Sequence, residues 1–252
     1  MKTETLYFEI TNQCNLNCKT CYNRSGLNRV RKELSAKQVE ETIQTFLPYG
    51  LKRVLFSGGE PTLHTEFSAF LEFPDRYPQL EFGIVTNGTI LREDFLNAIN
   101  QKKFTLQVSL DGSDETSNAR TRGVGNFQKT VNFLQKIHTP KIPIRLKCVL
   151  SQQNIDQLED FFELALSLNC TPEFAYIYRS GNGDLDWERK SLSPHQKAKA
   201  YERIRYLNQR HGATSFLPGC TDTCPFDAGL KNESAQMDEQ ITDIQGKKEQ
   251  IK

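Results

Sequence analysis

The chain has 252 residues and a nearly balanced charge, with 32 basic and 31 acidic side chains, so its composition gives no reason to expect a nucleic acid or a membrane surface as partner. The N-terminal segment MKTETLYFEI carries an acid and only a short apolar run, so we expect no signal peptide, and no apolar stretch approaches the roughly 20 residues that span a bilayer. Seven cysteines without a secretory signal predict a cytoplasmic protein, in which clustered cysteines are more often metal ligands or reactive thiols than disulfides.

Six short apolar runs, each followed by small or polar residues, are typical of strands in an α/β protein. The predicted strands cover residues 6–10, 54–56, 82–85, 104–110, 142–150 and 173–178. Helical patterns separate them, with apolar residues recurring at a period of 3.6. Strands that alternate with helices imply a parallel sheet with right-handed crossovers. Six such units predict a partial barrel or an open doubly wound sheet.

The helices between these strands carry start signals. Ser35 with Gln38 and Ser193 with Gln196 form capping boxes. Two asparagines, at 126 and 154, are predicted N-caps. The residues from 113 to 125 are expected as a loop, and the polar tail from 229 to 252 as a surface segment. The expected helices cover approximately 36–47, 65–73, 92–100, 127–137, 155–168 and 194–209.

The carboxyl ends of the predicted strands carry the unusual residues, and in parallel α/β folds the ligand binds at these ends. In chain order they are three cysteines, then Ser57-Gly58-Gly59-Glu60-Pro61, Thr86-Asn87-Gly88, Ser109-Leu110-Asp111-Gly112 and Gly181-Asn182-Gly183-Asp184. Each segment by itself is also an ordinary tight turn. Because they share one face with the cysteines, we predict one extended site there.

The cysteines after the first strand, Cys14, Cys18 and Cys21, are spaced C-x3-C-x2-C. A structural zinc site is closed by four ligands, so His64 or Cys148 would have to supply the fourth. An iron–sulfur cubane held by three thiolates instead keeps one iron free for an outside chelate. On these residues alone, a zinc site and an electron-transfer iron–sulfur module are alternatives.

Together, the cysteine triplet, GGEP at 58–61, TNG at 86–88 and SLDG at 109–112 resemble the radical S-adenosylmethionine (radical SAM) enzymes over about residues 4–180. The resemblance implies a partial (β/α)6 barrel in which the three cysteines hold a [4Fe-4S] cluster. It also implies that S-adenosylmethionine chelates the fourth iron, and that its reductive cleavage gives a 5′-deoxyadenosyl radical that abstracts hydrogen from the substrate.

The resemblance further implies cofactor contacts at the strand ends and at one arginine of the segment ARTRGVG. Glu60 is expected to accept from the cofactor amine, while Ser109 and Arg122 hold its carboxylate. Arg122 matches the family's Arg-Gly segment better than Arg120. Thr20 stands where many members have an adenine-stacking aromatic, and Tyr22 follows the cysteine instead. The expected cofactor-binding residues are Gly58, Gly59, Glu60, Pro61, Thr86, Asn87, Ser109, Asp111 and Arg122.

The carboxy-terminal part is similar to the SPASM/twitch subgroup. We expect residues 1–190 to form the radical SAM core, and 191–252 a helix with a truncated SPASM/twitch-like extension. Only Cys220 and Cys224 lie in that extension, and two cysteines cannot hold a cubane. Cys148 and Cys170 would complete a set of four, but core thiols are the preferred interpretation for both, so an auxiliary iron–sulfur cluster is the less favoured alternative.

The subgroup implies a function in the maturation of a ribosomally synthesised peptide, with a reductant such as flavodoxin or ferredoxin as electron donor. Radical oxidation or rearrangement of a small molecule of the aminoglycoside or nucleoside type is the alternative within the family. The four histidines are scattered, and Trp187 is better explained by packing than by substrate contact. The sequence therefore predicts the radical chemistry, and leaves the substrate as either a peptide or a small molecule.

Overall fold

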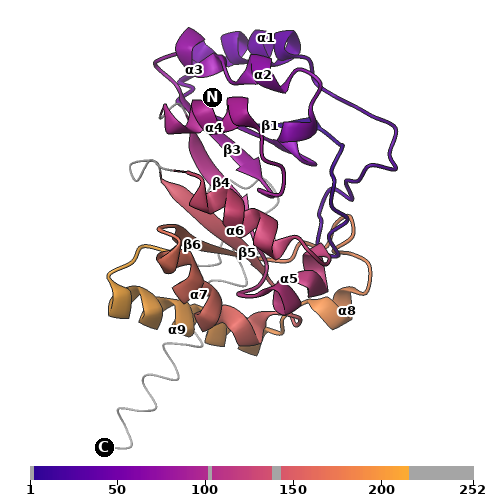
Figure 1. Ribbon diagram of the computed structural model, residues 1–252, viewed down its shortest axis with the longest axis vertical. Coiled ribbons are helices and arrows are strands. Elements are labelled where there is room, and N and C mark those ends of the chain that lie inside the picture. The colour runs from indigo at the N-terminus through magenta and orange to yellow at the C-terminus, as the bar shows by residue number, and fades with distance from the viewer. Residues whose placement is uncertain (1–2, 102–103, 138–142, 216–252) are drawn as a thin grey trace, which may run out of the picture.

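The computed structural model describes residues 3–101, 104–137 and 143–215. Its centre is one sheet of parallel strands whose spatial order follows the chain order from β1 to β6 (Figure 1). A doubly wound sheet would reverse its strand order at a switch point, so the uniform order excludes that alternative. The predicted α/β fold with six parallel strands is confirmed. The strands are β1 (Thr5–Thr11), β2 (Arg53–Gly58), β3 (Glu81–Thr86), β4 (Thr105–Ser109), β5 (Ile144–Leu150) and β6 (Thr171–Tyr176).

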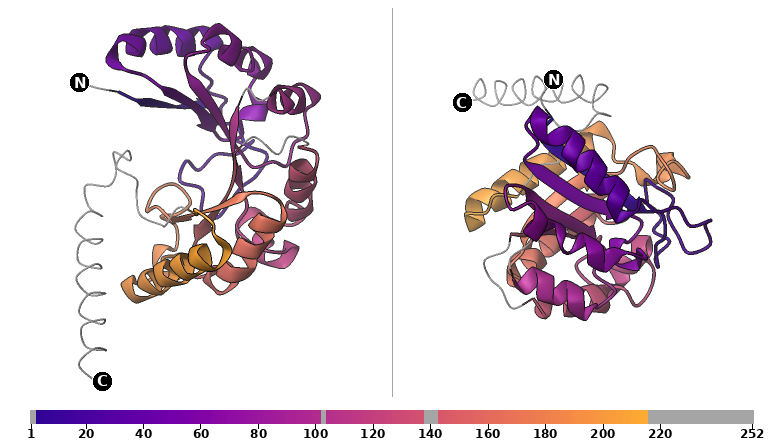
Figure 2. Two further views of the ribbon diagram at one scale, coloured as in Figure 1. Left: turned by 90° about the vertical axis from the view of Figure 1, so that its left-hand side faces the viewer. Right: turned by 90° about the horizontal axis from the view of Figure 1, so that it is seen from above.

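Helices cover the outer face of the curved sheet (Figure 2). A short 3-10 turn follows α1, another follows β2, and a third precedes α7. The helices are α1 (Ala36–Phe46), α2 (Phe67–Phe70), α3 (Phe73–Arg76), α4 (Glu93–Asn100), α5 (Glu115–Arg122), α6 (Phe127–Gln135), α7 (Leu158–Ser167), α8 (Trp187–Lys190) and α9 (Pro194–His211), with 3-10 turns at Leu47–Tyr49, Pro61–Leu63 and Ile155–Gln157.

Both predicted capping boxes are confirmed, at Ser35 and at Ser193. Asn126 and Asn154 stand at the N-cap positions of α6 and of the 3-10 turn before α7, but neither side chain caps, because each bonds within the preceding turn instead. Asn126 Nδ2 donates to the carbonyls of Arg122 and Gly123, and Asn154 Oδ1 accepts from the N–H of Ser151.

Two further expectations about helices are corrected. The single helix expected over 65–73 is two short helices, α2 and α3. Pro74 stands in the first turn of α3, where its missing N–H is tolerated but where it cannot continue α2. The expected loop at 113–125 contains α5, opened by a capping box of Asp114 with Ser117. This helix is polar nearly all round, so apolar periodicity gave no sign of it.

The two faces of the sheet differ in chemistry. Alternate strand residues such as Ile10, Phe56 and Val108 are fully buried beneath the helices. The opposite face carries polar residues such as Glu9 and Lys147, and it is this inner face onto which the strand-end segments open.

The long helix α9 packs against α7, and its Ala200, Ile204 and Leu207 join the same hydrophobic cluster as the strands. The division of the chain at residue 190 stays a prediction. Cys220 and Cys224 lie outside the described residues, as does all of the expected extension beyond residue 215. No helix within the described ranges is both long enough and apolar enough to cross a membrane.

Candidate cofactor site

The segment between β1 and α1 carries the three cysteines, and Figure 1 shows it running from the β1 end of the sheet toward α5 and α8. We call residues 12–24 the cysteine loop. Its first residues lie against the end of β2, where the N–H of Gly59 donates to Thr11 O at 2.6 Å and that of Glu60 donates to Gln13 O at 2.7 Å. A Cβ on Gly59 would lie 2.1 Å from Gln13 O, and one on Gly58 would lie 2.3 Å from Thr11 O. The glycines therefore permit a close approach to the cysteine loop itself.

The three thiols are all free and come from residues 14–21 of the cysteine loop. Cys14 is buried, Cys18 and Cys21 are partly exposed, and the N–H of Cys21 donates to Cys18 O at 3.2 Å. Burial raises the pKa of Cys14 to about 12 and that of Cys18 to about 11. The neighbouring thiols also act to raise the pKa of Cys14, by a smaller effect than burial.

The three thiols are candidate ligands for an iron–sulfur cluster or for a single metal ion. In the part of the chain that the structure describes, no three His, Cys, Asp or Glu side chains gather as ligands of one metal ion. A cubane binds each thiolate through a different iron, so its ligands need not converge on one point. The candidates for a fourth zinc ligand are occupied: His64 Nε2 contacts Leu34 O at 3.0 Å and its Nδ1 accepts from Glu66 N–H, while Cys148 is buried in the core.

Glu60 joins the ends of β2 and β3. Its carboxylate is fully buried, with Oε1 accepting from Thr62 Oγ1 at 2.7 Å and Thr86 Oγ1 at 2.8 Å, and Oε2 accepting from Asn87 N–H at 2.8 Å. Burial raises the pKa of Glu60 against these hydrogen bonds. Asn87 Nδ2 continues the network to Asn15 Oδ1, at 2.9 Å, on the cysteine loop. The structure thus brings together Glu60, Thr86 and Asn87, as predicted.

Asp111 and Arg122 form a buried ion pair, with Arg122 Nε 2.8 Å from Asp111 Oδ2. Asp111 is fully buried and also accepts from Val149 N–H at 2.9 Å and Thr121 Oγ1 at 3.2 Å. Burial alone would lower the pKa of Arg122, but the Asp111 carboxylate raises it. The pair is an ionic contact without a well-aligned hydrogen bond at Nε. The terminal nitrogens of Arg122 form no hydrogen bond with any described residue.

Arg122 lies beside the cysteine loop. Its guanidinium acts to lower the pKa of Cys18, opposing the effect of burial, and the N–H of Lys19 donates to Thr121 O at 2.9 Å. Ser109 stands at the end of β4 on the inner face, and its hydroxyl has no hydrogen-bond partner among the described residues. Asp111, Arg122 and Cys18 are therefore brought together, and the free ends of Arg122 are available to an anion there.

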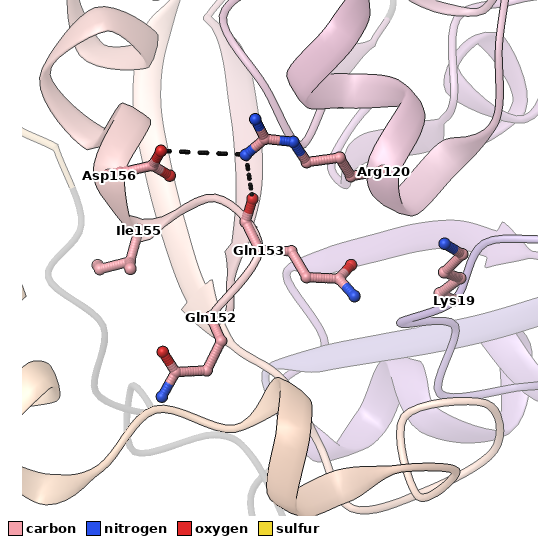
Figure 3. Close-up of a pocket in the computed structure, with 6 residues that line it drawn as sticks. All are labelled: Lys19, Arg120, Gln152, Gln153, Ile155 and Asp156. Carbon is pink, nitrogen blue, oxygen red and sulfur yellow. Dashed lines mark hydrogen bonds and ion pairs between the residues drawn. The ribbon is translucent and has the colours of Figure 1, made fainter.

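Arg120, the other arginine of this segment, lines an open cavity of about 310 Å³ (Figure 3). Its guanidinium donates to Gln153 O at 2.9 Å and lies 3.9 Å from Asp156. Arg122 rather than Arg120 therefore lies near Cys18, and its contact with the cofactor stays a prediction. The cavity is lined by Lys19, Arg120, Gln152, Gln153, Ile155 and Asp156.

The inner face also holds Tyr22, together with polar residues of β1, β5 and β6 that the sequence did not point to. Tyr22 donates its hydroxyl to Glu9 Oε1 at 2.8 Å, so this ring is directed toward β1. Lys147 Nζ pairs with Glu173 Oε1 at 2.9 Å across β5 and β6. Burial raises the pKa of Tyr7, which neighbours Tyr22. The sequence did carry a signal for this polar face. Strands of a parallel sheet covered on both sides are apolar throughout, whereas these strands have polar residues at alternate positions.

Comparisons with known proteins identify relatives of this chain. The mycofactocin maturase MftC of Mycolicibacterium smegmatis is 27% identical over 199 residues, which are 78% of this chain and 50% of that protein. The sporulation killing factor maturation protein SkfB of Bacillus subtilis is 25% identical, over 86% of this chain and 54% of that protein. This chain thus spans about half the length of these curated relatives.

The fold is shared with solved structures. Streptococcus suis SuiB bound to S-adenosylmethionine superposes with a TM-score of 0.73 at 16% identity, over 90% of this chain and 52% of that one. SuiB bound to its precursor peptide SuiA gives a TM-score of 0.70. The model of the Radical SAM superfamily matches residues 8–165, which is more than half of the chain. The chain therefore belongs to the radical SAM superfamily.

Proposed function

We propose that the protein is a radical SAM enzyme that modifies a ribosomally synthesised peptide. The observation that carries the proposal is one connected site on the inner side of the strand ends, in which Cys14, Cys18 and Cys21 lie between the Glu60 network and Arg122. When bound, a [4Fe-4S] cluster and S-adenosylmethionine would supply a 5′-deoxyadenosyl radical for hydrogen abstraction.

The residues present fit these groups. Three cysteines of one loop are the donor set for a cubane with one open iron. Arg122 offers terminal N–H groups that no described residue uses, in a mostly buried position, so they would hold a carboxylate together with the Ser109 hydroxyl. The Glu60 carboxylate is fully buried and holds the ends of β2 and β3 together, so the backbone of residues 58–61 would offer the acceptors for the ammonium.

The remaining predicted residues would hold the strand ends and their side chains in place around the cofactor. Gly58 and Gly59 let the end of β2 lie against the cysteine loop, and Pro61 begins the 3-10 turn that keeps Glu60 extended. Thr86 fixes the Glu60 carboxylate, and Asp111 fixes Arg122. We propose no adenine contact for Thr20, which is buried, or for Tyr22, whose hydroxyl is bound to Glu9.

A peptide substrate is supported by the maturases MftC and SkfB and by SuiB with its precursor peptide, each of which this chain resembles. The polar inner face would hold the substrate near the site. A one-electron donor such as flavodoxin or ferredoxin belongs to the same proposal, because the chemistry needs a reduced cluster.

Deuterium transfer tests the peptide proposal. Short peptides encoded beside the gene would be made with perdeuterated residues and incubated with reconstituted protein, S-adenosylmethionine and dithionite. We expect deuterium in 5′-deoxyadenosine and a mass change in the peptide. If 5′-deoxyadenosine forms at a rate that no such peptide changes, and without deuterium, then peptide modification is wrong.

A further inference from the structure

The segment that follows β6, residues 180–190, lies along the cysteine loop and binds its carbonyl oxygens. Asn182 makes two of these contacts: its backbone N–H donates to Cys21 O at 2.7 Å, and its Nδ2 donates to Cys18 O at 2.9 Å. Ser180 Oγ adds a third, to Tyr22 O at 3.0 Å. One side chain and one N–H of Asn182 thus bind the carbonyls of two expected cluster ligands.

Lys190, at the end of α8, adds another contact with a carbonyl of the cysteine loop. Its side chain is buried, and its ammonium donates to the carbonyls of Lys19, at 3.0 Å, and Asn182, at 2.9 Å, and also to that of Leu185. Three carbonyls satisfy the three ammonium N–H groups, and no carboxylate of a described residue pairs with the charge. Burying a charged ammonium without a counter-ion is costly, so a purely structural role is more simply met by a neutral side chain.

These contacts decide which way the loop's peptide groups point. With the carbonyls of residues 18, 19, 21 and 22 held by the segment after β6, the N–H groups of Thr20 and Tyr22 have no hydrogen-bond partner among the described residues, and that of Cys18 is directed at its own thiol. N–H groups and positive charge directed at a cluster are the levers by which a protein raises its reduction potential.

We propose that Asn182 and Lys190 are positioning residues for the cluster. Asn182 holds the cysteine loop with its carbonyls outward, and the Lys190 ammonium supplies a buried positive charge that favours the reduced cluster. The inference rests on the proposed function, since it concerns the group that Cys14, Cys18 and Cys21 would hold. It goes beyond that function by naming two residues that bind neither the iron nor S-adenosylmethionine.

The test compares Asn182→Ala and Lys190→Met with a matched control, Arg189→Met. Arg189 is exposed on the same short helix, so the control removes the same charge from the neighbouring position without touching the cysteine loop. Each protein would be reconstituted anaerobically, and three quantities measured: irons per chain, the rate of iron loss to an excess of a ferrous chelator, and the cluster midpoint potential by EPR-monitored titration.

We expect Asn182→Ala and Lys190→Met to lose iron about tenfold faster than the parent, and Arg189→Met to match the parent. Lys190→Met should also lower the ratio of reduced to oxidised cluster about tenfold at a fixed potential, which is about 59 mV for a one-electron couple. Asn182→Ala removes no charge and should shift the potential less. A merely structural role would not give this difference between the two variants.

Equal iron loss and equal potentials in the parent and both variants would overturn the inference. If Lys190→Met fails to fold by circular dichroism, Asn182→Ala decides: a folded variant that keeps iron as firmly as the parent refutes the positioning role. A parent protein that takes up no cluster would instead refute the proposed function, so the two failures are distinguishable.

Discussion

Replacing Gly59 by alanine tests the packing of the cysteine loop against β2. The new Cβ would lie 2.1 Å from Gln13 O and 2.6 Å from Gln13 C, both backbone atoms, whereas ordinary contacts begin at 3.4 Å. The loop must therefore retreat by at least about 1 Å, which lengthens the hydrogen bond from Glu60 N–H to Gln13 O. Overpacking of this kind costs about 1–3 kcal/mol, and a lost hydrogen bond adds about 1 kcal/mol.

We therefore expect the free energy of unfolding of the cluster-free protein to fall by about 2–4 kcal/mol, measured by urea denaturation with circular dichroism. Because Cys14 follows Gln13, cluster loading should fall as well. Gly26→Ala is the matched control, since a Cβ there meets no atom within 4 Å. A Gly59→Ala protein with unchanged urea midpoint and full iron content would refute the argument.

Further substitutions probe the buried titratable side chains. Arg122→Gln leaves Asp111 buried without its counter-charge, so unfolding in urea should show a loss of about 3–5 kcal/mol, and Asp111→Asn added to it should recover most of that loss. Glu60→Gln sets an amide N–H₂ against donors of Thr86 or Asn87, at a cost of about 1–3 kcal/mol in the same assay. The pKa of His64 is lowered from 6.5 by burial, so the neutral ring is favoured in the folded protein. The contribution of His64 to stability should therefore be constant above pH 6.5 and fall as the pH drops below it, because the unfolded chain takes up the proton first. His64→Gln should flatten the dependence of the unfolding free energy on pH in this range. Equal slopes in the parent and the variant would contradict the lowered pKa of His64.

The sheet was predictable because each strand is a short apolar run between turn residues, and all six parallel strands lie within a few residues of the predicted positions. The polar helix α5 was not, because it has no apolar stripe and is held by its capping box and by contacts to the cysteine loop. The two asparagine side chains do not cap for a related reason, since asparagine bonds equally well within a turn.

Within the site, spacing and strand ends identified Glu60, Thr86 and Asn87 as neighbours, and the structure joins them through one carboxylate. The pairing of Asp111 with Arg122 could be identified only from the structure, because α5 carries the arginine back over the end of β4. The same holds for Lys190. Lysine side chains are mostly exposed, so the sequence suggests a surface position, whereas the fold buries this one among backbone carbonyls.

The central claim is that the cysteine loop holds a cluster which cleaves S-adenosylmethionine. The most direct test is anaerobic reconstitution of the parent and of Cys18→Ala, followed by iron analysis and assay of 5′-deoxyadenosine with dithionite and S-adenosylmethionine. The account predicts about four irons per chain and 5′-deoxyadenosine release in the parent, with both lost in Cys18→Ala. Uptake of zinc in place of iron, or undiminished 5′-deoxyadenosine release by Cys18→Ala, would contradict it.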